Sequence, residues 1–290
     1  MISGGAVLWR AMVHFWDESL LMIRANVMWF LAIIPLYLVT VVAIVSTTAI
    51  AQWFMGSAID PEAEPSSLPW ILAAFMLIVL PSPPAAGVYT IAMYIVNGET
   101  PEFSVFWQAL RRWWKRTLLM YVIGAALLGG LIFNTIFYMS VTAGILQAIS
   151  VLWVYAIVFW LTLQAYLLPL LVMPVVPPPT AAADDGWPLD EARRAELAAA
   201  SDPQAPATPA EPVVEPTLRD LYKRAAILAL ANPIFSLTLF FGTFLTLAIS
   251  TFAMPVYPLL AMSFVALIHC RGFRVLYDKY SSTEARGAAR

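Results

Sequence analysis

Long hydrophobic stretches dominate the chain and alternate with short polar segments. Six of these stretches contain no Asp, Glu, Lys or Arg; they cover residues 27–55, 69–96, 118–139, 144–176, 225–250 and 253–270. A helix needs about 20 apolar residues to cross the ~30 Å hydrocarbon core of a bilayer. The pattern therefore predicts an all-α membrane protein whose six transmembrane helices form three hairpins.

Each predicted hairpin follows an amphipathic segment, which we interpret as a cytoplasmic stem; the stems lie in residues 1–25, in 101–117 and from 217 onwards. A helix with aromatic residues on one face and bases on another is suited to the headgroup layer. In the second stem the predicted headgroup-binding residues are Arg111, Arg112, Trp113, Trp114, Lys115 and Arg116. The three stems also align as a weak repeat, for which chance similarity between segments rich in Trp and Leu is the alternative.

Two local motifs refine this picture. Thr217 followed by Asp220 resembles a capping box and predicts that the third stem begins after Pro216. The prolines Pro81–Pro84 divide the second apolar stretch into halves of about 18 Å each. A discontinuous helix often marks a substrate site in transporters. The alternative is a kink that neighbouring helices stabilise, and the absence of charge within the six stretches favours it.

Composition indicates the class of protein, and the distribution of charge predicts its orientation in the membrane. With 61% hydrophobic and 12% charged residues, the chain departs far from the roughly 25% charged residues of soluble domains, so a soluble protein is excluded. Six crossings leave all 16 Lys and Arg residues on the side of the two termini. The positive-inside rule then predicts the cytoplasmic (inner) membrane with both termini in the cytoplasm. The start of the chain lacks a basic region, so we expect no cleaved signal peptide.

The chain divides at its polar segments. After the stem in 1–25, residues 26–176 form a four-span membrane part. Residues 177–216 are rich in Pro, Ala and acids, which predicts a disordered cytoplasmic linker, either a tether or a docking segment. The stem and last two spans fall within 217–280, and 281–290 form a cytoplasmic tail.

The sequence offers little catalytic chemistry. It contains one Cys and two His residues and none of the common metal, phosphate or dinucleotide motifs. We therefore predict no enzyme activity, no cofactor and no metal site. The net charge of -2 gives no indication of nucleic-acid binding. Both histidines, His14 and His269, are expected near the cytoplasmic boundary as ordinary interfacial residues.

Several short motifs together carry a family resemblance; they are Asn26 to Pro35 followed by Thr40, Pro83-Pro84 with Gly87, Asn97-Gly98-Glu99, the Arg111 to Trp114 run, Asn232-Pro233, and the closing run from Arg271 to Tyr277. With these motifs the chain resembles the YesL-like family of bacterial integral membrane proteins, whose function is unknown. The linker at 177–216 departs from the compact pattern of that family. The resemblance implies a multi-span helical protein and, because some members are associated with carbohydrate uptake, an accessory role beside a transporter. It also implies structural importance for Asn26, Pro35, Pro83, Pro84, Gly87, Asn232 and Pro233.

Two functions remain open from the sequence. The first is a non-enzymatic accessory or regulatory protein that binds lipid headgroups and a membrane transporter subunit. The alternative is a small transporter for a neutral solute, with the discontinuous second helix at its substrate site.

Overall fold

The computed structural model describes residues 4–54, 76, 79–140, 144–175, 216–252 and 260–288, and these residues form helices and short connections without a β-strand. The helices are α1 (Gly4–Asp17), α2 (Ser19–Phe54), α4 (Pro83–Val96), α5 (Ser104–Ser140), α6 (Gly144–Val172), α8 (Leu218–Ala231), α9 (Pro233–Phe252) and α10 (Met262–Ala288), with a short 3-10 turn η1 (Met173–Val175) after α6. The prediction of an all-α fold is confirmed for these residues. The predicted linker lies outside them, apart from residue 216.

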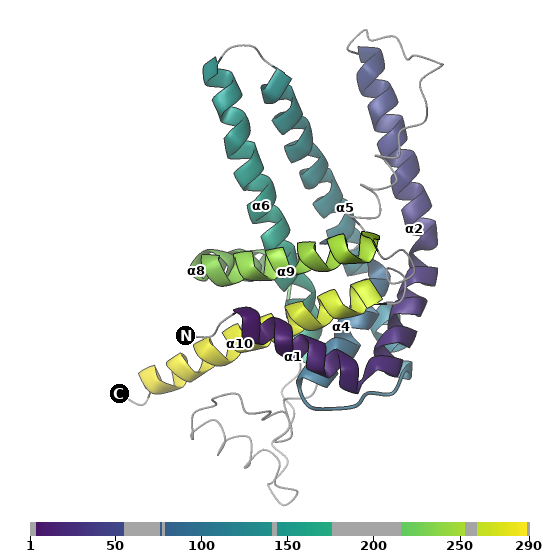
Figure 1. The fold of residues 1–290 in the computed structure, drawn as a ribbon, viewed down its shortest axis with the longest axis vertical. Coiled ribbons are helices and arrows are strands. Elements are labelled where there is room, and N and C mark those ends of the chain that lie inside the picture. The colour runs from purple at the N-terminus through teal and green to yellow at the C-terminus, as the bar shows by residue number, and fades with distance from the viewer. Residues whose placement is uncertain are drawn as a thin grey trace, which may run out of the picture.

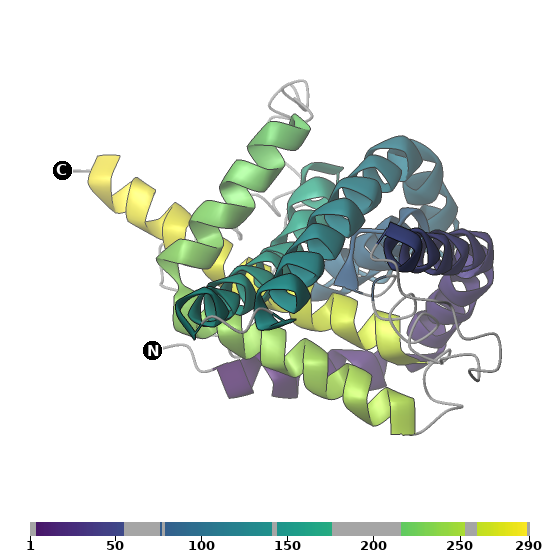
Figure 2. The ribbon, with the colours of Figure 1, turned by 90° about the horizontal axis from the view of Figure 1, so that it is seen from above.

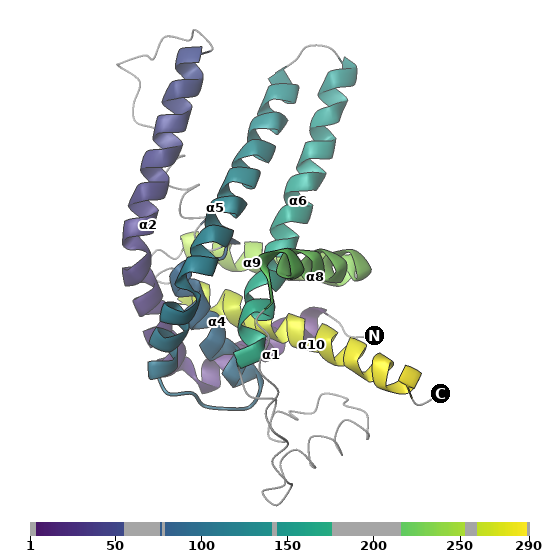
Figure 3. The same ribbon diagram turned by 180° about the vertical axis from the view of Figure 1, so that it is seen from behind.

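The helices run in two main directions. Helices α2, α5 and α6 stand along the long axis, and α5 and α6 lie side by side as an antiparallel pair (Figure 1, Figure 3). Helices α1, α8, α9 and α10 run crosswise to them, and Figure 2 shows α8, α9 and α10 along much of their length from above. We call "the base" the part formed by α1, α4 and α10 with the ends of α2, α5 and α6 that pack on them.

Four described helices are long and apolar enough to cross a membrane: Ser19–Thr47, Ser104–Met139, Ala148–Val172 and Pro233–Ser250. They overlap the first, third, fourth and fifth predicted spans. The arrangement of six spans in three hairpins is not confirmed, because α9 lies across α5 and α6 rather than along them (Figure 1).

The second predicted span is interrupted where the prolines indicated. Ser82 is extended (φ −87°, ψ 154°), and α4 begins directly after it with Pro83 and Pro84 in its first positions. Proline is tolerated there because the first helical N–H groups have no partner within the helix. Helix α4 therefore has 14 residues, too few to cross a bilayer.

Helix α4 is enclosed by other helices. Twelve of its residues are buried, among them the small residues Ala85, Ala86 and Gly87. A Cβ added to Gly87 would lie 2.5 Å from Cδ2 and 2.9 Å from the backbone oxygen of Phe106 on α5. The missing side chain at Gly87 is therefore what allows the backbones of α4 and α5 to approach so closely.

Two of the predicted stems are separate helices, and one is not. Helix α1 ends before α2, and α8 ends at Ala231 with Asn232 as its C-cap, so the helix of the fifth predicted span begins at Pro233 and not at residue 225. The second stem is continuous with its span in the 37-residue helix α5. No glycine or proline interrupts residues 104–123, so the helix simply continues.

The start of α8 confirms the predicted cap. The Thr217 hydroxyl accepts a hydrogen bond from the backbone N–H of Asp220 (3.2 Å) and donates to the Asp220 carboxylate (2.6 Å). This hydroxyl lowers the pKa of the Asp220 carboxyl below its usual value, and the nearby Arg224 and Arg219 contribute in the same direction. The cap satisfies an N–H group that would otherwise have no partner.

Helix α10 differs from the predicted sixth span. Residues 253–259 lie outside the described residues, and Met262–Ala288 form one helix that carries Arg271, Arg274 and Asp278 after its apolar first part. It does not qualify as a membrane span by length and composition. It also continues into the segment predicted as a tail. Its first half is buried and packs on α4, so α4 and α10 together form the centre of the base.

Candidate functional site

The polar side chains of the base gather along α10. Near its first turn, Asn26 of α2 is fully buried. Its Oδ1 accepts hydrogen bonds from the backbone N–H (2.8 Å) and the hydroxyl (3.3 Å) of Ser263. The Ser263 hydroxyl also lies 2.7 Å from the backbone oxygen of Met22. Asn26 thus satisfies an N–H group of the first turn of α10 from a position 237 residues away.

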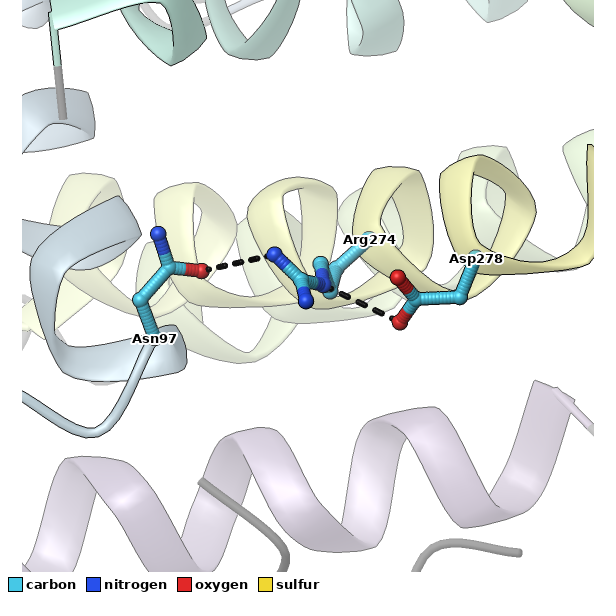
Figure 4. A network of polar contacts seen from close by, with 3 residues as sticks. All are labelled: Asn97, Arg274 and Asp278. Carbon is cyan, nitrogen blue, oxygen red and sulfur yellow. Dashed lines mark hydrogen bonds and ion pairs between the residues drawn. The ribbon is translucent and has the colours of Figure 1, made fainter. Parts of the chain in front are cut away.

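A second contact joins α10 to the end of α4. The Arg274 guanidinium donates to Asn97 Oδ1 through Nη1 (3.3 Å) and to Asp278 Oδ2 through Nε (3.0 Å) (Figure 4). Asn97 is the C-cap of α4, and Gly98 has φ 81°, a conformation that glycine adopts at little cost. The turn places the Asn97 side chain against α10.

A third contact involves the junction of α8 and α9. Asn232 donates to the hydroxyl of Tyr280 (2.8 Å), and Lys279 Nζ donates to Asn232 Oδ1 (3.1 Å). Asn232 is also the C-cap of α8, and Pro233 begins α9 directly after it. Asn26 and Asn232, which the family resemblance singled out, thus contact opposite ends of α10.

His269 lies between these contacts and is 4% exposed. Its Nδ1 is 2.6 Å from the hydroxyl of Tyr89 on α4, and its Nε2 is 2.7 Å from the hydroxyl of Thr243 on α9. The expectation of an ordinary interfacial histidine is therefore wrong for His269. The residue connects three helices through its two ring nitrogens.

The partners of His269 determine its tautomer. The Thr243 hydroxyl donates its own proton to the backbone oxygen of Leu239 (2.9 Å). Its oxygen must then accept from Nε2–H, which leaves Nδ1 to accept from the Tyr89 hydroxyl. The neutral imidazole satisfies this chain with one donor and one acceptor.

Thr243 and His269 also line a small pocket between α6 and α9, next to Val79 before the proline break. Its other lining residues are Leu161, Ala165, Phe240, Phe244 and Leu247, and the cavity volume is about 20 Å³. This space admits one water molecule or one methyl group. Within the described residues, no group of three His, Cys, Asp or Glu side chains could hold a metal ion.

The predicted headgroup residues occupy different surroundings. Arg111, Arg112, Trp114 and Lys115 are exposed, and Arg116 is half-buried and donates to the backbone oxygen of Pro216 (3.3 Å). Trp113 is 1% exposed and belongs to the core of the base. The guanidinium carbon of Arg112 lies 5.0 Å from the Trp113 ring centroid. Headgroup contact remains a prediction for the other five residues, whereas Trp113 packs inside the protein.

The remaining structural positions are also accounted for. Pro35 lies within α2, which continues through it. Pro83, Pro84 and Pro233 are at helix starts, and Gly87 is at the closest approach of α4 and α5.

No family model matches the chain, and the comparisons found no matching curated protein or solved structure.

The contacts of His269 with Tyr89 and Thr243 were not predicted from the sequence. His269 lies 180 residues from Tyr89 and 26 residues from Thr243. A signal was present, because a histidine within an apolar stretch is uncommon and indicates a buried polar partner.

Proposed function

We propose that the chain is a multi-pass protein of the cytoplasmic (inner) membrane, with both termini in the cytoplasm. In this proposal it acts as a non-enzymatic accessory or regulatory component beside a membrane transporter subunit. The resemblance to the YesL-like family suggests carbohydrate uptake as the process. The four apolar helices support a membrane protein.

The enclosure of α4 is the observation that carries the accessory role. A transporter with a discontinuous helix uses the interruption to expose backbone groups to a solute-filled cavity. Here the first residues after the interruption are packed against neighbouring helices, with Gly87 in direct contact with Phe106. The pocket beside the interruption has room for one small group and mainly apolar walls. This geometry favours a structural role for the interruption.

The exposed bases of α5 support contact with anionic lipid. Arg111, Arg112 and Lys115 lie on the outside of the base, and Lys115 Nζ lies 5.7 Å from the ring centroid of Trp114. Bases and an indole ring on one helix fit the boundary between headgroups and hydrocarbon.

The accessory role is tested by purification from native membranes in mild detergent. A transporter subunit should co-purify in a fixed ratio with the tagged chain and be lost when the detergent is made harsher. Recovery of the chain alone, in every mild detergent that keeps it folded, would contradict the accessory role.

The lipid contact has its own test. Changing Arg111, Arg112 and Lys115 to Gln should lower the number of anionic lipids that remain bound after purification. The matched control changes Arg219, Lys223 and Arg224 of α8 to Gln, which removes the same charge from another exposed helix. Equal loss in both variants would show that net charge, not the α5 site, retains the lipid.

A transporter for a neutral solute remains the second candidate because the interruption of the second span is present in the structure, with Ser82 extended before Pro83. If this reading is right, proteoliposomes carry a neutral-solute flux that the double change of Pro83 and Pro84 to Ala abolishes. A flux that survives the change would weaken it.

A further inference from the structure

The pocket beside the interruption of the second span has mainly apolar walls, a property that the accessory role does not explain. It joins three elements that are distant in sequence: Val79 before the interruption, Ala165 on α6, and the Thr243 region of α9, with His269 of α10 as a further wall. Six of its eight lining residues are apolar.

The two polar lining residues satisfy each other. Nε2 of His269 donates to the Thr243 hydroxyl, which donates onward to the backbone oxygen of Leu239, and Tyr89 occupies the other ring nitrogen. A bound water would need two to four polar partners, and these groups are already engaged. The pocket therefore favours a hydrocarbon group over a polar one.

The mouth of the pocket opens towards an apolar surface. Phe244 lines the pocket and is 56% exposed, and its neighbours on α9, Phe241 and Leu245, are also exposed. Both flanking helices, α6 and α9, are apolar enough to cross a membrane. Outside the mouth a bilayer would supply acyl chains and little water.

From this geometry we propose that the pocket holds the end of an acyl chain of a bilayer lipid, inserted between α6 and α9 beside the interruption of the second span. The cavity of about 20 Å³ accommodates the terminal methyl group, and the preceding chain lies against Phe244. This inference depends on the proposed membrane location but not on the accessory role. It makes the contact between α6 and α9 sensitive to the acyl chains around the protein.

Photo-crosslinking tests the proposal. The full chain is placed in nanodiscs of phosphatidylcholine that contain a small fraction of lipid with a diazirine at the end of one acyl chain. After illumination, mass spectrometry should find crosslinks at pocket residues of α6 and α9. The change Ala165→Val places methyl groups in the cavity and should lower these crosslinks by about fourfold, the factor expected for losing the burial of one hydrocarbon group.

Two further variants keep the result interpretable. Ala126→Val places the same side chain at an exposed position of α5 and should leave the pocket crosslinks unchanged. Phe244→Ala removes the side chain against which the acyl chain lies, at an exposed residue where truncation is tolerated. It should lower the pocket crosslinks even if Ala165→Val fails to fold. Pocket crosslinks that change in neither Ala165→Val nor Phe244→Ala would overturn the proposal.

The same mass spectra distinguish a failure of the proposed pocket from a failure of the proposed membrane location. Crosslinks at the exposed Ile136 of α5 with none in the pocket would reject the pocket and retain the membrane location. The absence of crosslinks at both places would reject the membrane location itself.

A second measurement uses the small number of histidines. The chain has two, so labelling histidine with ¹⁵N gives signals from His14 and His269 alone. We expect a magnetisation-transfer contact between the His269 ring and the terminal methyl of ¹³C-labelled acyl chains, and none at His14. Contacts of equal strength at both rings would contradict a specific pocket.

Discussion

Two asparagines show how the base differs from the upper parts of the upright helices. Asn26 on α2 is fully buried and binds Ser263 on α10. Asn134 on α5 is half-buried and donates to the backbone oxygen of Gly130, one turn earlier in its own helix (2.8 Å). In the base an asparagine side chain joins two helices, whereas above the base an asparagine side chain bonds to the backbone of its own helix.

Glycines show the same contrast. Gly87 has Phe106 where its Cβ would be, whereas no atom outside the helix backbone lies within 4 Å of a Cβ at Gly129. The base is therefore packed by the protein itself. The upper parts of α2, α5 and α6 expose large apolar side chains, among them Val42, Phe137 and Leu152. Such surfaces are stable only beside another apolar phase, and a bilayer provides one.

The largest expected effect is at Gly87. The change Gly87→Ala forces α4 and α5 apart, because the new Cβ meets backbone as well as ring atoms of Phe106. We expect a loss of about 3 kcal/mol in the free energy of unfolding, measured by denaturation in detergent. Gly129→Ala is the matched control and should leave stability unchanged or raise it by up to about 1 kcal/mol. Equal changes in the free energy of unfolding at both positions would contradict the difference in packing between the base and the upper part of α5.

The asparagine pair comes next. Removing the side chain in Asn26→Ala leaves the N–H of Ser263 buried without its acceptor, which costs about 2 kcal/mol. Asn134→Ala should change stability by less than about 0.5 kcal/mol. If the two changes lowered the free energy of unfolding by the same amount, the contact between Asn26 and Ser263 would not contribute to stability in solution.

A smaller effect is expected from the contact between α4 and α10. In Arg274→Met the stem of the side chain is kept and the bonds to Asn97 and Asp278 are lost, at a cost of about 1.5 kcal/mol. The control Arg111→Met removes an exposed charge and should affect lipid retention rather than thermal unfolding. A loss of thermal stability in Arg111→Met together with unchanged stability in Arg274→Met would contradict the structure.

The smallest effect is at the cap of α8. The change Thr217→Ala removes the hydroxyl that accepts from the N–H of Asp220, with an expected loss of about 1 kcal/mol. Thr217→Ser keeps the hydroxyl and should restore most of that stability. A thermal midpoint that is the same in all three proteins would show that the cap contributes nothing.

Local features of the fold could be predicted from the sequence. The interruption at Pro81–Pro84, the cap at Thr217 and the helical class follow from the chemistry of neighbouring residues, and all three are present. The family resemblance singled out Asn26 and Asn232 as structurally important, and the structure supplies their partners on α10.

The missed features depend on distant parts of the chain. Trp113 was predicted to contact lipid headgroups as part of the aromatic face of an amphipathic stem, but the structure buries it in the core. His269 has partners on α4 and α9, which no local pattern reveals. The crosswise course of α9 is set by packing, for example of Gly242 against Leu8 of α1. Apolar periodicity cannot distinguish contact with lipid from contact with another helix.

The most direct test of the contrast between the two regions is cysteine labelling along α5 in intact membranes. Cys270 is the only cysteine in the sequence and is buried, so an introduced cysteine can be labelled selectively. Lys115→Cys lies beside the base, and Ile136→Cys lies on the exposed apolar surface about 32 Å further along the helix. We predict that a water-soluble maleimide modifies position 115 readily and position 136 only after the membrane is dissolved in detergent. Equally rapid labelling of both positions in intact membranes would contradict the account.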